Sequence, residues 1–204
     1  GKNEEKNIFW SSINYWKEST LEYKKVVTLI LIFTLVNSSD MFLLLKVKEI
    51  TNSDESVIKM YIFYNMIYAA SAYFLGVISD KVGRLKVYAL GLIFFAATYL
   101  LIGLTTNIFL LYLAFVLYGL FSAATEGISK AWISSLCKKE DLGVALGFQN
   151  TTQSICVMFA SFFAGIIWIK ISSNAVFIMS GTVAFILAIL IVYMSKIKSQ
   201  KYHI

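Results

Sequence analysis

Six apolar segments dominate this sequence of 204 residues, and each is long enough to cross a lipid bilayer. A bilayer core about 30 Å thick is spanned by roughly 20 apolar residues of α-helix. Hydrophobic residues make up 58% of the chain and charged residues 15%, which excludes an ordinary soluble domain. We therefore predict an all-α integral membrane protein with six transmembrane helices, at about 26–45, 57–78, 86–105, 108–135, 143–169 and 174–195.

The distribution of basic residues predicts the orientation of these helices. Thirteen Lys and Arg residues fall on the side that holds both termini and four on the other, with Lys130 inside a segment. The positive-inside rule then places both termini in the cytoplasm of a multi-pass protein of the cell (inner or plasma) membrane. The net charge of +6 is accordingly attributed to loops facing anionic lipid, with no nucleic-acid partner.

The bundle at 25–195 is flanked by a linker at 1–24 and a basic cytoplasmic tail at 196–204. In the linker, Phe9, Ile13 and Trp16 follow a spacing of i, i+4 and i+7. This spacing fits an amphipathic helix on the cytoplasmic membrane surface, and a loosely ordered linker fits equally well.

The residue types that carry most enzyme chemistry are scarce. Cys137 and Cys156 lack a metal or redox spacing and are interpreted as reduced packing residues, and the single histidine, His203, lies in the tail. No nucleotide-binding loop or nucleophile–base set is visible. We expect no enzyme, cofactor or metal site, which leaves an ion gradient as the energy source for any transport.

A short charged turn, residues 76–86, separates the second and third segments. Its polar residues cannot lie in hydrocarbon, so the turn is predicted to be a loop at the membrane surface. The turn holds Gly76, Asp80, Lys81, Gly83, Arg84 and Lys86 at fixed spacing.

This spacing resembles the loop motif of the major facilitator superfamily, in which the Asp and the basic residues form a latch that breaks when the transporter changes state. The resemblance implies a half of a twelve-helix transporter, the C-terminal half, with an N-terminal six-helix half as partner. In many relatives the loop after the fourth span carries Pro and Arg and contributes an inner latch. Lys138 and Leu142 stand in those positions here, so the resemblance does not extend to that latch. An alternative is that six spans are the whole protein and pair as a homodimer.

The polarity of the segments supports an internal repeat. Segments one and two carry polar side chains and segment three is nearly all apolar, and segments four to six repeat this order. Such a profile is expected of a 3+3 inverted repeat.

Three ionisable residues fall inside the segments: Asp40, Glu126 and Lys130. Such residues are costly in a membrane and are functional candidates, here for coupling to protons. Glu126 and Lys130 are four residues apart, so they could instead form a structural ion pair along one helix face. Asp40 could pair with Lys130, exchange protons or reach outer water from a helix end.

Neutral polar residues form stripes on two segments and are candidates for lining a solute cavity. The cavity candidates are Asn37, Tyr61, Asn65, Tyr68, Gln149 and Gln153. Each of these could also bond a neighbouring helix or sit at the membrane interface.

Together these features favour a secondary active transporter that moves a small solute by alternating access and is coupled to protons. The alternative is a membrane receptor or scaffold on the same fold that does not transport.

Overall fold

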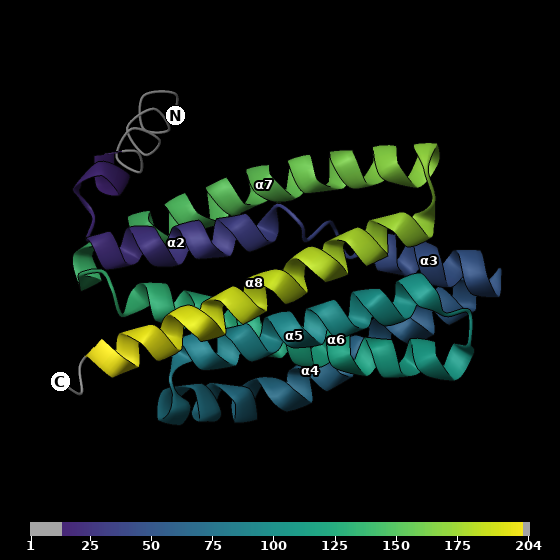
Figure 1. Cartoon of the computed structure of the whole chain (residues 1–204), viewed down its shortest axis with the longest axis horizontal. Coiled ribbons are helices and arrows are strands. Elements are labelled where there is room, and N and C mark those ends of the chain that lie inside the picture. The colour runs from purple at the N-terminus through teal and green to yellow at the C-terminus, as the bar shows by residue number, and fades with distance from the viewer. Residues whose placement is uncertain (1–13, 202–204) are drawn as a thin grey trace.

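The computed structural model describes residues 14–201, with side chains as far as residue 193, and it is helical nearly throughout (Figure 1). Phe9, Ile13 and the side chains of the basic tail lie outside the described residues. The helices are α2 (Leu21–Thr34), α3 (Met41–Thr51), α4 (Asp54–Val82), α5 (Arg84–Leu104), α6 (Ile108–Ser134), the 3₁₀ turn η1 (Lys139–Asp141), α7 (Leu142–Lys170) and α8 (Ser173–Lys201).

Side-chain caps explain where several helices begin. Thr20, Ser53 and Asn107 each accept a hydrogen bond from a backbone N–H in the first turn of α2, α4 and α6, respectively. Such caps satisfy donors that a helix leaves free at its N-terminus. The helices α4, α5, α6, α7 and α8 are each long and apolar enough to cross a membrane, judged by length and composition.

The first predicted span, 26–45, is wrong as a single helix. Helix α2 ends at Thr34 and α3 begins at Met41, and residues 35–40 between them are irregular. The run from Asn37 to Asp40 is entirely polar, and short polar side chains compete with helical hydrogen bonds. Non-helical backbone at membrane depth is tolerated where it lines a cavity, so this break is the first pointer to a site.

The predicted loop at 76–86 is also wrong in extent. Helix α4 continues through Asp80 and Lys81 to Val82, and α5 starts at Arg84, so Gly83 alone connects them. A glycine is required there because its φ of 101° and ψ of 135° suit no other residue well. The other predicted ends differ from the structure by a few residues.

Replacing Gly83 with Ala is expected to lower the free energy of unfolding by about 1 to 3 kcal/mol, through backbone strain alone. A Cβ at Gly83 would meet no atom within 4 Å, so crowding makes no contribution. Gly76→Ala is the matched control, since Gly76 is helical with equally open space. Thermal unfolding in detergent measures both, and equal midpoints for the two variants would contradict the conformational role of Gly83.

The helices pack in pairs that follow the predicted repeat. Contact between α4 and α6 is mirrored by contact between α7 and α2, and the α4–α5 pair is mirrored by α7–α8. Helices α5 and α8, the last of each triplet, pack extensively on each other. Figure 1 shows α2 beside α7 on one side of the bundle, α8 crossing α5, and the start of α2 at the same end as the end of α8.

Aromatic side chains fill the centre where α2, α5 and α6 meet. The rings of Phe33, Phe95 and Phe121 contact one another with centroids 4.9 to 5.7 Å apart, and all three are buried. Edge-to-face contacts of this kind favour one relative placement of the rings. They fix the rotation of α2 and α6 and so decide which of their side chains face the cavity described below.

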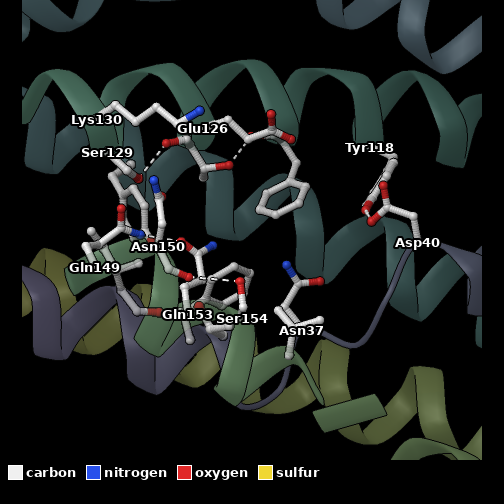
Figure 2. Close-up of a pocket in the computed structure, with 17 residues that line it drawn as sticks. Asn37, Asp40, Tyr118, Glu126, Ser129, Lys130, Gln149, Asn150, Gln153 and Ser154 are labelled. Carbon is white, nitrogen blue, oxygen red and sulfur yellow. Dashed lines mark hydrogen bonds between the residues drawn. The ribbon is translucent and has the colours of Figure 1, made fainter. Parts of the chain in front are cut away.

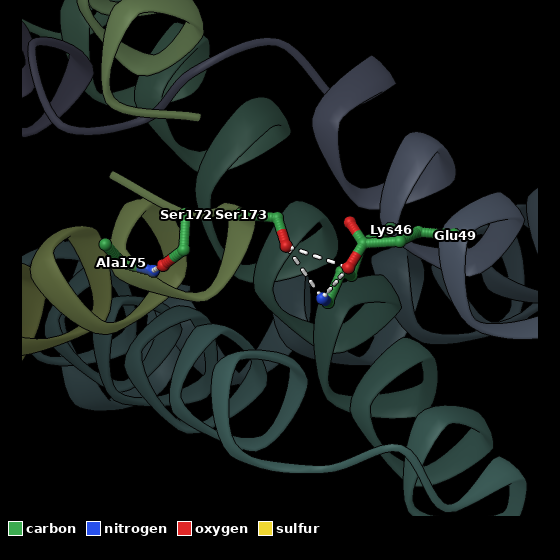
Figure 3. Close-up of polar contacts among 5 residues, drawn as sticks. All are labelled: Lys46, Glu49, Ser172, Ser173 and Ala175. Atoms are coloured by element: carbon green, nitrogen blue, oxygen red, sulfur yellow. Dashed lines mark hydrogen bonds and ion pairs between the residues drawn. The ribbon is translucent and has the colours of Figure 1, made fainter. Parts of the chain in front are cut away.

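A polar cluster joins α3 to the start of α8 (Figure 3), at the end of the bundle opposite the turn between α4 and α5 (Figure 1). Lys46 is 4% exposed, and its Nζ donates to Glu49 Oε1 at 2.6 Å and to Ser173 Oγ at 2.8 Å. Ser173 Oγ in turn donates to Glu49 Oε1 at 2.9 Å. A buried ammonium needs such partners, so this cluster holds α3 in place beyond the helix break.

Candidate functional site

A polar cavity of about 610 Å³ lies where α2, α6 and α7 face one another, beside the break between α2 and α3 (Figure 2). Its polar lining comprises Thr34, Asn37, Asp40, Tyr118, Thr125, Glu126, Ser129, Lys130, Gln149, Asn150, Gln153 and Ser154. Ile30, Phe33, Tyr88, Phe121 and Val157 complete the wall. A polar cavity of this size within a membrane bundle suits a small solute.

The break between α2 and α3 presents Asp40 to this cavity. Asp40 stands at the N-cap of α3, and no hydrogen bond from its side chain caps that helix. Its carboxylate instead accepts hydrogen bonds from the hydroxyl groups of Tyr118 on α6 and Tyr64 on α4, the latter at 3.3 Å. The carboxylate is therefore held between three separate elements, where a change in its charge would act on all of them.

Helix α6 supplies the two other charged groups. Glu126 and Lys130 both line the cavity and are exposed in the described chain. The ion pair between them, one of the two alternatives left open by the sequence, is not formed: the salt bridges among the described residues join other partners. The neighbouring hydroxyl groups of Thr125 and Ser129 donate to carbonyls of their own helix, so these donors are not available to the Glu126 carboxylate.

Helix α7 supplies amide groups opposite α6. Gln149 is 2% exposed, and its Nε2 donates to Gln153 Oε1. The other amide atom, Gln149 Oε1, is buried without a hydrogen-bond partner, as is Asn37 Oδ1 at the helix break. Buried acceptors are normally paired, so these two oxygens mark positions where a donor is missing.

Not all of the predicted cavity residues reach this cavity. Asn37, Gln149 and Gln153 line it, together with the three predicted coupling residues. Tyr61, Asn65 and Tyr68 on α4 are absent from its lining, and Asn65 donates to Tyr61 O on its own helix. Tyr64 of α4 is absent from the lining too, but it donates to Asp40, and Tyr68 lies next to Glu126.

The charged turn near Gly83 is linked to α6. Arg84 Nη1 donates to Ser135 Oγ at 2.5 Å, just beyond the end of α6, and Arg84 lies 3.8 Å from Asp80. Lys81 and Lys86 are exposed. Arg84 thus contacts the end of the helix that carries both cavity charges.

Comparison with known proteins identifies the family. Residues 26–202 match the sequence model of the Major Facilitator Superfamily. The chain belongs to the major facilitator superfamily. This membership confirms the predicted fold class, a multi-pass half of the superfamily fold, and agrees with the expectation that the chain is not an enzyme.

One curated relative shows how much of a whole transporter this chain corresponds to. An uncharacterized MFS-type transporter of Methanocaldococcus jannaschii is 33% identical to this superfamily chain over 178 residues. The match covers 84% of this chain and 44% of the relative, so the chain spans about half the length of the curated relative it matches.

The sequence analysis missed Tyr118 as a site residue, although a signal for it exists. Tyr118, Ser122, Thr125 and Ser129 recur at helical spacing along α6, so they mark one polar face. Tyrosine is common in apolar segments as a packing residue, so Tyr118 was not recognised as the first residue of this polar face.

The His, Cys, Asp and Glu side chains of the described residues are the ones that could bind a metal or carry a reactive thiol. The side chains described, those of residues 14–193, include no group of three His, Cys, Asp or Glu that could hold a metal. Cys137 and Cys156 are free. Cys137 lies beyond the end of α6, and burial raises the pKa of its thiol, which disfavours the reactive thiolate.

Proposed function

We propose that the protein containing this chain is a secondary active transporter that moves a small solute by alternating access and is coupled to protons. The observation that carries the proposal is the polar cavity beside a broken helix, with Asp40 held there by Tyr64 and Tyr118. Broken helices beside midplane cavities are how many transporter folds bind solutes and coupling ions. Membership of the superfamily and the transporter name of the relative support this function.

In this proposal Asp40 is the residue that takes up and releases the proton. A neutral carboxyl and a carboxylate interact differently with Tyr64 and Tyr118, so protonation biases how α3, α4 and α6 pack. Asp80 and Arg84 act as the latch of the turn, with Gly76, Lys81, Gly83 and Lys86 completing it. Breaking the Arg84–Ser135 hydrogen bond would free the end of α6 to move.

The proposal includes an N-terminal six-helix half, which covers the side of the cavity that the helices of this chain leave open. The most apolar stretches of α4 and α7 are only 17% and 11% buried, against 61% for α5. Both helices therefore leave apolar surface that a second half would cover. Both termini of this half would face the cytoplasm of the cell membrane. Transport would follow from rocking of the two halves around the cavity.

Binding and uptake by the native-length protein test the proposal. A library of sugars, amino acids, organic acids, nucleosides and drugs is screened by thermal shift, where a ligand at about 100 times its Kd stabilises by roughly 2.7 kcal/mol. Hits are then offered to proteoliposomes with and without an imposed pH gradient. We expect a solute that accumulates only with the gradient. A well-folded protein that binds and moves none of them would instead support a receptor or scaffold.

A further inference from the structure

We infer that the solute is a zwitterion, a small molecule that carries one ammonium group and one carboxylate, as an α-amino acid does. The inference rests on the proposed transport function and names the solute class of the same cavity. Three observations lead to it: two opposite charges on α6 that form no salt bridge with a described residue, a separate carboxylate on another wall, and two buried acceptors without a partner among the described residues.

The charges on α6 fit the two ends of such a solute. Glu126 and Lys130 are four residues apart, so their backbones are about 6 Å apart along the helix axis. Both side chains line the cavity and neither is in a salt bridge with a described residue. A solute lying along α6 can place its ammonium at Glu126 and its carboxylate at Lys130.

Charge balance favours this solute over singly charged ones. Glu126 and Lys130 together carry no net charge, and a zwitterion adds none while pairing both. A lone anion or cation would pair one of them and leave the other uncompensated inside the membrane, which is costly. Asp40 is bound to Tyr64 and Tyr118 and stays available for the proton, so solute and proton do not compete for one carboxylate.

The unpartnered acceptors support an ammonium group. Gln149 is 2% exposed, and its Oε1 and Asn37 Oδ1 are buried without a hydrogen-bond partner on the same cavity. An ammonium has three N–H donors, of which Glu126 can accept one. Gln149 and Asn37 lie at different places along the cavity (Figure 2), so one solute ammonium can use at most one of these amide oxygens.

The test compares each amino acid with blocked derivatives on the native-length protein. Binding is measured for α-amino acids, their N-acetyl derivatives, which lack the ammonium, and their amides, which lack the carboxylate. We expect at least one amino acid to bind at least about tenfold more tightly than either of its derivatives, since each block removes a hydrogen-bonded charge pair. Tighter binding of a sugar, an organic cation or an organic anion, with no response to amino acids, would overturn the inference and leave the transport function standing.

Two variants test which residue binds each charged group of the solute. Glu126→Gln is expected to weaken binding of the amino acid at least about tenfold but to change binding of its N-acetyl derivative less than about twofold. Lys130→Met is expected to weaken binding of the amino acid at least about tenfold and to change binding of its amide derivative less than about twofold. Glu55→Gln and Lys170→Met make the same chemical changes at exposed positions outside the cavity and should alter neither. Equal losses for the amino acid and its blocked form would contradict the assignment, while retained binding of the blocked form shows that the variant folds.

Discussion

Replacing Asp40 with Asn is expected to abolish the dependence of solute uptake on the pH gradient. Asn is nearly isosteric and can still accept from Tyr64 or Tyr118, but it cannot exchange a proton. Uptake with the gradient should fall to the level measured without it, because no protonation step remains that could link the two. Binding of the solute in the absence of a gradient should persist. Proteoliposome uptake at several internal and external pH values measures both effects.

Asp54→Asn provides the matched control. Asp54 makes an exposed salt bridge with Lys48 at 2.7 Å, so its loss should cost little and leave coupling intact. Tyr118→Phe keeps the Asp40 carboxylate and removes one of its donors, and we expect an intermediate loss of about tenfold. If Asp40→Asn transports with unchanged pH dependence, the proton site lies elsewhere, and Glu126→Gln becomes the next variant to examine.

Replacing Gly119 with Ala is expected to lower the free energy of unfolding by about 1 to 3 kcal/mol, the usual range for overpacking. Gly119 lies where α6 crosses α4. A Cβ there would come within 2.8 Å of both Tyr64 O and Ile67 Cβ. A backbone carbonyl inside a helix cannot move aside, so the two helices must separate. Because Tyr64 also holds Asp40, this separation should reduce coupled transport as well.

Gly127→Ala controls for the change of residue type. Gly127 lies on the same helix, two turns further on, and a Cβ there meets no atom within 4 Å. Alanine is the better helix former by roughly 0.5 to 1 kcal/mol, so this variant should be neutral or slightly more stable. Unfolding in detergent followed by circular dichroism compares the two. A Gly119→Ala protein as stable as Gly127→Ala would contradict the close approach of α4 and α6.

The fold class could be read from the sequence because a bilayer sets the length and apolarity of each crossing. Five segments form helices close to the predicted ranges, and the motif residues Gly83 and Arg84 stand at the turn between the second and third crossings. The prediction of the first crossing as one helix was wrong because hydropathy is averaged over a stretch of many residues. The four polar residues at 37–40 are too few to interrupt an apolar segment on such a scale, although they break its helix.

Six of the residues singled out in the sequence line the cavity, but the sequence did not show how they meet. Asp40, Glu126 and Gln153 were recognised because polar groups inside apolar segments are rare and costly. Which of them meet depends on how each helix is rotated about its axis, and hydropathy carries little of that information, since lipid is as apolar as a helix surface. The same reasoning therefore placed Tyr61 and Tyr68 at the cavity and overlooked Tyr118.

The sequence by itself determined that this chain crosses a membrane, where its crossings lie, to which family it belongs and which charged residues it carries into the bilayer. Only the tertiary structure decided that the first crossing is broken at residues 35–40 and that two tyrosines from other helices hold the Asp40 carboxylate. It also decided that Glu126 and Lys130 face a cavity without a salt bridge to any described residue. The reason is physical: length and apolarity are properties of one segment, whereas a site in a membrane bundle is made by the close packing of several.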